Sequence, residues 1–276
     1  MECKNMKKTI ALDCSDGLDL SLTLDCGQCF RWSENDDGSW HAVVQGKKAD
    51  VYTENQKLYV CGDGSEGNEK FWQSYFDLGR DYSSVCEKLK TDKWLKKAIE
   101  AYPGIRILKQ DPWETLCSFI ISQNNNIPRI KGIIERLCTF FGEDLGGGDF
   151  SFPSAERLAV LSEQDLAPIR SGFRAKYILD AARRVASGET ELEKVAAMPI
   201  DEARAELQKI KGVGPKVAEC ALLYGFGRAE AFPVDVWVKR IMQELYPEGL
   251  PACTENVEGI AQQYLFHWRR NISEND

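Results

Sequence analysis

The stretch IKGVGPKVAECALLYGFGRAEAFPVD, residues 210–235, decides how the rest of the chain is interpreted. Two glycines, Gly212 and Gly214, separate two segments in which apolar side chains recur every three or four positions, the spacing of an amphipathic helix. Pro215 takes the first position of the second segment, where a helix tolerates proline. The sequence therefore predicts a helix, a tight glycine-rich hairpin and a second helix over about residues 201–226.

The predicted hairpin has the properties of an anion site. Glycines let the backbone turn with positive φ and let another molecule approach it closely. The free N–H groups and the positive dipole end of the second helix attract an anion, and a DNA phosphate fits there without regard to base sequence. Many connections between helices carry glycine only for geometry, so Gly212 and Gly214 alone leave a purely structural role open.

Lys216 and Asp235 add chemistry to this stretch. Lys216 falls in the first turn of the second helix, where the dipole disfavours a cation and favours a neutral, nucleophilic amine. A carboxylate near Lys216, such as Asp235, would raise the pKa of the amine again, so the two effects oppose each other. Asp235 follows Phe232-Pro233-Val234 and precedes a helical pattern over Val236–Leu245. Two ordinary roles compete with catalysis, because Lys216 could be a solvated surface lysine and Asp235 a helix N-cap.

The composition is that of a water-soluble globular protein. The chain has 276 residues with 43% hydrophobic content, and no apolar run approaches the length of a membrane span. The first eight residues lack the apolar core of a signal peptide. Ten irregularly spaced cysteines without an export signal indicate reduced thiols in an intracellular protein. We expect no membrane association, no metal site and no cofactor.

The net charge of −8 argues against a nucleic-acid partner at first sight. The basic side chains nevertheless gather in two places, and the first group contains a single acid, Asp180. The two groups are Arg170, Arg174, Lys176, Arg183 and Arg184, and then Lys209, Lys211 and Lys216 around the hairpin. An acidic body with a local basic face is compatible with DNA binding.

Residues 1–110 predict an antiparallel β-sheet domain with flanking helices. Residues 35–38, Asn-Asp-Asp-Gly, are typical of a hairpin turn, and residues 63–67 are typical of a loop. Helical patterns follow at Glu69–Trp72 and Tyr82–Leu89. The predicted strands are Thr9–Leu12, Leu18–Leu24, Cys29–Ser33, Trp40–Gln45, Lys48–Thr53 and Lys57–Cys61.

Residues 111–276 predict an all-helical domain, so the fold class is α+β. Trp113–Ser122 is almost continuously apolar and predicts a buried helix. Asn126 is a suitable N-cap for the next helix, and Gly142 a suitable C-terminal stop. A Gly-rich loop is expected at 142–154. Further helices are predicted at about 154–159, 162–169, 176–187 and, at the C-terminal end, 254–270.

The hairpin, Lys216 and Pro233-Val234-Asp235 resemble the helix-hairpin-helix (HhH-GPD) DNA glycosylase superfamily. Within it, Val213–Cys220 resembles the 8-oxoguanine DNA glycosylases, which are bifunctional glycosylases and abasic-site lyases. The resemblance implies base flipping, attack of the Lys216 amine on C1′ and stabilisation of the developing sugar charge by Asp235. The resulting Schiff base would permit β-elimination without a metal or organic cofactor.

The resemblance extends to the residues that would hold the extruded base. Leu24–Trp32 resembles the family's Gly-Gln-Ser-Phe-Arg-Trp segment, which implies that the Gly27 carbonyl accepts a hydrogen bond from N7–H of 8-oxoguanine. Gln262 and Phe266 share a helical face, and the family pattern implies that they read and stack on the base, with Cys220 stacking on its other side. The ordinary alternatives are a strand entered through a glycine turn, and a buried Phe beside a surface Gln.

DNA-contacting residues follow from two more matches. Residues 124–129 resemble the Asn-Asn-Asn-Ile-x-Arg loop, which implies that Asn124 fills the vacated stack and Arg129 contacts the estranged cytosine. Residues 172–177 imply a Phe173 wedge and a second contact from Arg174. Gly212, Gly214 and Trp237 complete the expected DNA contacts. Trp237 stands where the animal enzymes have histidine and Tyr224 where they have methionine, which leaves phosphate contacts and pocket shape in doubt.

The expected substrate is double-stranded DNA containing 8-oxoguanine opposite cytosine, and the expected protein is an intracellular monomer. Its compartment would be cytoplasm and nucleoid in a bacterium, or the nucleus in a eukaryote. Only Cys253 lies beyond the hairpin region, so the superfamily branch with a C-terminal four-cysteine cluster is disfavoured. Two rivals stay open: a damage-sensing module without turnover, and a glycosylase for alkylated or mispaired bases.

Overall fold

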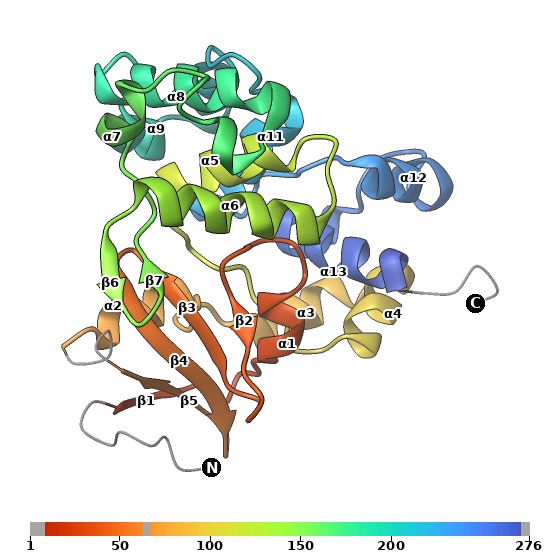
Figure 1. The fold of residues 1–276 in the computed structure, drawn as a ribbon. Coiled ribbons are helices and arrows are strands. Elements are labelled where there is room, and N and C mark those ends of the chain that lie inside the picture. Colours follow the sequence, from red (N-terminus) through yellow and green to blue (C-terminus); the bar gives the residue numbers. More distant parts are fainter. Residues whose placement is uncertain (1–8, 63–66, 272–276) are drawn as a thin grey trace.

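The computed structural model describes residues 9–62 and 67–271. An antiparallel sheet lies at the lower left of Figure 1, helices α7–α11 lie at the top, and α6 runs between them. The α+β class predicted from the sequence is confirmed. The predicted loop at 63–67 falls outside the described residues except for Gly67, as does the N-terminal segment 1–8. No described helix is both long and apolar enough to cross a membrane.

The sheet has five antiparallel strands: β1 (Thr9–Asp13), β2 (Ser33–Glu34), β3 (Trp40–Val44), β4 (Lys47–Glu54) and β5 (Lys57–Cys61). Their spatial order is β1-β5-β4-β3-β2. Val51 of β4 pairs with Val60 of β5, and both side chains are fully buried, as alternation along a half-buried strand requires. The predicted turn at 35–38 connects β2 and β3, and Gly38 adopts φ +81° there.

Two predicted strands are wrong. Leu18–Leu24 contains helix α1 (Leu20–Leu24), because the Asp19 carboxylate accepts a hydrogen bond from Leu22 N at 2.8 Å and starts a helical turn. Of the predicted strand Cys29–Ser33, only Ser33 is in a strand. Residues 25–32 form a loop instead, and the fully buried Gln28 amide fastens this loop to residues 106–108.

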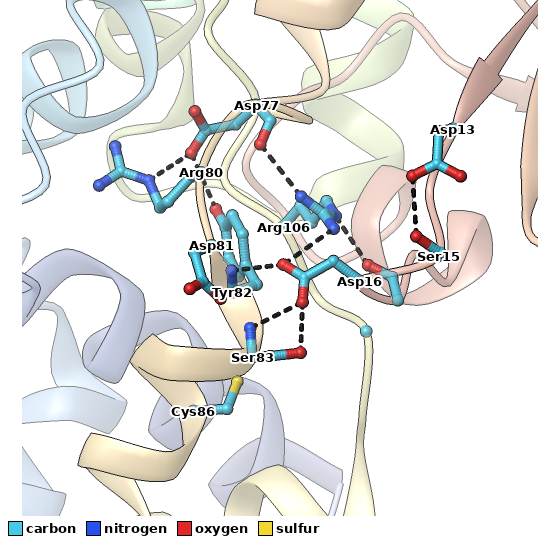
Figure 2. A network of polar contacts seen from close by, with 12 residues as sticks. Asp13, Ser15, Asp16, Asp77, Arg80, Asp81, Tyr82, Ser83, Cys86 and Arg106 are labelled. Atoms are coloured by element: carbon cyan, nitrogen blue, oxygen red, sulfur yellow. Dashed lines mark hydrogen bonds and ion pairs between the residues drawn. The ribbon is translucent and has the colours of Figure 1, made fainter.

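The helices of the N-terminal region are α2 (Glu69–Tyr75), α3 (Tyr82–Leu89) and α4 (Lys93–Ala101). Helix α4 has no counterpart among the elements predicted from the sequence. A buried polar network holds this region together (Figure 2). Arg106, 1% exposed, donates from Nε to the Gly17 carbonyl at 2.7 Å and from Nη1 to the Asp77 carbonyl at 3.0 Å. Its Nη2 lies 3.7 Å from the Asp16 carboxylate, which also accepts the Ser83 amide at 2.9 Å.

The remaining helices are α5 (Pro112–Ser122), α6 (Ile127–Phe141), α7 (Ala155–Ala159), α8 (Ala175–Ala186), α9 (Leu192–Ala197), α10 (Ile200–Leu207), α11 (Pro215–Cys220), α12 (Val236–Leu245) and α13 (Glu258–Asn271). Short turns are η1 (Ala167–Ile169), η2 (Gly172–Arg174), the π-helical η3 (Ala221–Gly225) and η4 (Ala252–Thr254). The predicted caps are confirmed: Asn126 accepts from Arg129 N at 3.0 Å, and Gly142 N donates to the Cys138 carbonyl at 2.7 Å.

Three further predictions for this region need correction. The segment 162–169 is helical only at η1, since Ser162 pairs with Asp165 in a local turn and Pro168 lacks an N–H donor. The expected loop at 142–154 contains a hairpin of β6 (Asp144–Gly146) and β7 (Asp149–Phe150). Its turn uses glycines with positive φ at 146–148. The predicted C-terminal helix begins at Glu258, not at 254, and α9 was not predicted.

Candidate active site

The predicted helix-hairpin-helix consists of α10, a turn and α11. Gly212 has φ +83°, and a Cβ built there would lie 2.3 Å from the Tyr177 ring, so only glycine fits. Gly214 differs, with extended backbone (φ −92°, ψ −178°) at the N-cap of α11, so of the two hairpin glycines only Gly212 has a positive φ. A Cβ at Gly214 would meet nothing within 4 Å. Glycine is therefore required at position 212 by packing against Tyr177. At position 214 a side chain would have room, because the surface there is open.

A cavity of about 720 Å³ opens beside α11. Residues from the loop before β2, from the end of α5 and from the loop between α5 and α6 line one part of the cavity. Residues from the beginnings of α11 and α12 and from α13 line the rest. Seven residues singled out from the sequence line it: Gly27, Asn124, Gly214, Lys216, Asp235, Trp237 and Phe266. The cavity thus gathers segments that are separated by more than 200 positions in the chain.

Lys216 is a cavity residue and not a solvated surface lysine. Its side chain is half-buried, and Nζ lies 4.9 Å from the centre of the Phe119 ring and 3.5 Å from Ser122 Oγ. The amine therefore rests on an aromatic face, with one neutral hydroxyl nearby.

Asp235 is both a helix N-cap and a residue of the cavity lining. Its carboxylate caps α12 by accepting a hydrogen bond from Val238 N at 2.8 Å. The same side chain lines the cavity together with Lys216. The charged residues of the cavity lining are Lys216, Asp235 and Arg270.

Cys220 and Gln262 are buried and are not among the residues that line the cavity. Cys220 is 2% exposed, and burial raises its pKa to about 11 against the opposing effect of Lys216. Gln262 is 4% exposed, and its Oε1 is buried without a hydrogen-bond partner among the described residues. Such an orphaned acceptor is costly unless a partner arrives. Phe266, one turn further along α13, is half-buried and lines the cavity.

Arg174, predicted to contact DNA, is buried and hydrogen-bonded to backbone carbonyls in the structure. It is 2% exposed and donates from Nε to the Gln123 carbonyl and from Nη2 to the Asn124 carbonyl, each at 2.9 Å. Burial, together with the nearby Arg129, lowers its pKa from the usual arginine value. Arg174 therefore holds the asparagine loop, in which Asn124 adopts φ +47°. Phe173 is half exposed and Arg129 is exposed, as contacts with another molecule require.

Two family models match the chain. Residues 10–116 match the "8-oxoguanine DNA glycosylase, N-terminal domain". Residues 117–261 match the "HhH-GPD superfamily base excision DNA repair protein". The chain belongs to the 8-oxoguanine DNA glycosylase family. The HhH-GPD match contains the hairpin and both Lys216 and Asp235.

Known members of the family are similar along most of their length. The N-glycosylase/DNA lyase of Saccharomyces cerevisiae is 34% identical over 257 residues, covering 82% of this chain and 68% of the relative. The "Probable N-glycosylase/DNA lyase" of Methanothermobacter thermautotrophicus is 35% identical over 262 residues, covering 83% of each. The 8-oxoguanine glycosylase/lyase of Clostridium acetobutylicum, solved with DNA containing cytosine opposite 8-oxoguanine, has 35% identity, a TM-score of 0.87 and 96% coverage of both chains.

This member of the 8-oxoguanine DNA glycosylase family is a bifunctional base excision repair enzyme, an N-glycosylase and a DNA lyase. Its cysteines do not form a metal site in the described residues, where no cluster of His, Cys, Asp or Glu could hold an ion. Cys26 and Cys29 have C-x-x-C spacing but are both free. Burial raises the pKa of Cys26 to about 11 and that of Cys29 well above the usual thiol value, so both are poor ligands.

Several cavity residues of this glycosylase were not singled out from the sequence. They include Phe30, Phe119, Ser122 and Arg270. Arg270 follows Phe266 by one helical turn, so helical spacing could have suggested it. Phe119 and Ser122 end an apolar helix, and nothing in that pattern separates the cavity wall from the core.

Proposed function

We propose that this enzyme flips 8-oxoguanine out of duplex DNA and excises it, preferring cytosine on the opposite strand. The observation that carries the proposal is the presence of Lys216, Asp235 and Gly27 in the lining of one 720 Å³ cavity. A nucleophile, a carboxylate and a backbone acceptor at one opening suit an extruded damaged base. The Clostridium acetobutylicum relative, solved with this kind of DNA, supports the same substrate.

The chemistry we propose is nucleophilic substitution at the sugar. Neutral Lys216 Nζ forms a bond to C1′ while the glycosidic bond breaks and its electron pair leaves with the base. Asp235 stabilises the positive charge that develops on the sugar. The protonated secondary amine formed in this step then gives up a proton. The C1′–O4′ bond breaks, O4′ takes up a proton, and the opened sugar is left joined to Lys216 as a Schiff base. Removal of a proton from C2′ expels the 3′ phosphate and cleaves the strand.

Base recognition in this proposal uses the groups around the cavity. The Gly27 carbonyl accepts N7–H of 8-oxoguanine, and unmodified guanine would present a lone pair there. Gln262, whose Oε1 has no partner among the described residues, reads the Watson–Crick edge. Phe266 and Cys220 stack on opposite faces of the base.

The DNA interface we propose surrounds the same opening. Asn124 and Phe173 occupy or wedge the vacated stack, and Arg129 contacts the estranged cytosine. Arg174 joins Arg129 at that base by exchanging its present carbonyl partners for it. Contacts to the DNA backbone come from Gly212, Gly214 and Trp237. Trp237 is 38% exposed, and the centre of its ring lies 5.4 Å from the Arg240 guanidinium.

We further propose a domain boundary near residue 110, with a β-sheet domain at 1–110 and a helical domain at 111–276. The five-stranded sheet before this boundary and the predominance of helices after it support the division. We also propose an intracellular monomer that needs no cofactor, because a single chain supplies every residue of the cavity lining.

The test of the proposed function is base release from four duplexes that carry 8-oxoguanine opposite each normal base. We expect free 8-oxoguanine and a nicked strand, fastest with cytosine opposite. Release of 3-methyladenine from alkylated DNA, with 8-oxoguanine left intact, would indicate instead a glycosylase for alkylated bases. Tight binding without release from any duplex would support the damage-sensing rival.

The two hairpin glycines should respond differently to alanine. Gly212→Ala combines a strained positive φ with a clash against Tyr177, so the free energy of unfolding should fall by about 2 kcal/mol or more. Gly214→Ala meets no protein atom, so stability should change by less than about 0.5 kcal/mol. Its added methyl group would stand between the hairpin and the DNA backbone, weakening binding about tenfold. Thermal unfolding and fluorescence anisotropy would measure the two effects.

A further inference from the structure

Tyr224 contacts the aromatic ring that lies beneath Lys216 and is connected, through Gln263, to the loop that carries Gly27. It lies on η3, is 4% exposed, and stacks on Phe119 with ring centres 5.4 Å apart and planes 18° from parallel. Phe119 in turn lies beneath Lys216 Nζ at 4.9 Å. The Tyr224 ring therefore supports the aromatic face on which the amine rests.

The hydroxyl of Tyr224 reaches in another direction. It donates a hydrogen bond to Oε1 of Gln263, which is 1% exposed, at 2.6 Å. Burial raises the pKa of Tyr224 far above its usual value, so the hydroxyl stays protonated and remains a donor. An amide carries its oxygen and its NH2 group on opposite sides. Fixing the oxygen of Gln263 therefore fixes the direction of its NH2 group.

That NH2 group points to the base-reading loop. Gln263 Nε2 donates to the Cys26 carbonyl at 3.5 Å, and Cys26 directly precedes Gly27. Gly27 adopts φ +88°, a conformation that its surroundings must hold in place. On the other side, Gln28 Nε2 donates to the Thr23 carbonyl at 2.9 Å and to the Arg106 carbonyl at 2.8 Å. The two neighbours of Gly27 are thus both held by buried amides, Cys26 by Gln263 and Gln28 by its own side chain.

We propose that Tyr224 is a positioning residue for base selection, because its hydroxyl, acting through Gln263, holds the Gly27 carbonyl where it meets N7–H of the damaged base. The inference rests on the proposed function and deepens it. Gln263 is adjacent in α13 to Gln262, the second side chain proposed to read the base. The hydrogen bond between Tyr224 and Gln263 therefore also restrains α13 next to Gln262.

A purely structural role for Tyr224 makes a different prediction. Loss of packing would lower every activity of the enzyme together. Loss of positioning would affect only steps that depend on recognising the base. Cleavage at a preformed abasic site needs Lys216 but presents no base to Gly27, so it separates the two roles.

The experiment compares Tyr224→Phe with wild type under single-turnover conditions. The substrates are 8-oxoguanine opposite cytosine, guanine opposite cytosine, and an abasic site opposite cytosine. Phenylalanine keeps the stack on Phe119 and removes only the hydroxyl. We expect excision of 8-oxoguanine to slow at least about tenfold and its preference over guanine to fall, as expected when a buried hydrogen bond is lost. Abasic-site cleavage should stay within about twofold of wild type.

Two companion variants sharpen the comparison. Tyr246→Phe is the control, since its hydroxyl donates to Asp92 at 2.6 Å away from the cavity lining, and it should leave selectivity unchanged. Gln263→Met removes the amide that hydrogen-bonds to both Tyr224 and the Cys26 carbonyl. It should therefore reproduce the slower excision and lower selectivity expected for Tyr224→Phe. The double variant should be no worse than either single variant, because the two changes interrupt one connection.

Three outcomes would overturn the inference. The first is unchanged excision and selectivity in Tyr224→Phe. The second is an equal loss of excision and abasic-site cleavage. The third is additive loss in the double variant. Failure of wild type to release 8-oxoguanine would instead refute the proposed function, so the two failures are distinguishable.

Discussion

Lys216→Gln should abolish covalent trapping and reduce both base excision and strand cleavage by at least about 10³-fold, the scale expected when a covalent nucleophile is removed. Glutamine keeps two of the four methylene groups of lysine but places no nucleophilic amine over Phe119. Without the amine no Schiff base forms, and borohydride has nothing to reduce. Trapping on 8-oxoguanine duplexes, followed by gel electrophoresis, measures the loss directly.

Lys211→Gln is the matched control for this prediction. It lies in the same hairpin, but its side chain is 77% exposed and pairs with Asp180 at 3.5 Å. We expect it to weaken DNA binding modestly and to leave trapping intact. A trapped complex in Lys216→Gln would remove Lys216 from the mechanism. Release of 8-oxoguanine by wild type without any trapped complex would indicate attack by water.

The parts of the fold that were predictable depend on local signals. The beginning of α6 follows from Asn126 as N-cap, and its end from Gly142, because capping needs only neighbouring residues. Helix α12 has the predicted bounds, Val236–Leu245, since Asp235 marks its beginning. The hairpin between α10 and α11 was visible for the same reason: its signals lie within a few residues of one another.

The parts that were not predictable depend on contacts distant in sequence. Residues 25–32 have the composition of a strand, yet the tertiary hydrogen bonds of Gln28 make them a loop. The contact between Gln263 and Cys26 joins residues 237 positions apart, which no local pattern specifies. Arg174 is similar, because its sequence neighbours give no sign that it would bury itself against the Gln123 carbonyl.

The cavity shows how these two kinds of information combine. Sequence motifs identified seven of its lining residues, each from a short local match. Their assembly depends on α5, which packs against α6, η3 and α11 and brings Phe119 beneath Lys216. The chemistry of the site is therefore encoded locally, whereas its geometry is encoded by packing.

Asp235→Asn and Asp235→Ala should separate the capping role of this carboxylate from its proposed catalytic role. Asparagine caps a helix about as well as aspartate, so Asp235→Asn should change the free energy of unfolding by less than about 0.5 kcal/mol. Alanine cannot accept the hydrogen bond from Val238 N, so Asp235→Ala should lose about 1 kcal/mol of stability.

Both variants should excise 8-oxoguanine at least about 100-fold more slowly than wild type, because each lacks the negative charge that would stabilise the sugar cation. Chemical denaturation gives the stabilities, and single-turnover excision gives the rates. A catalytic carboxylate predicts equal rate losses in the two variants despite unequal stabilities. A mere helix cap predicts near-normal excision in Asp235→Asn and a deficit only in Asp235→Ala. The asparagine variant therefore decides the matter, since it retains the cap and changes the charge of the cavity.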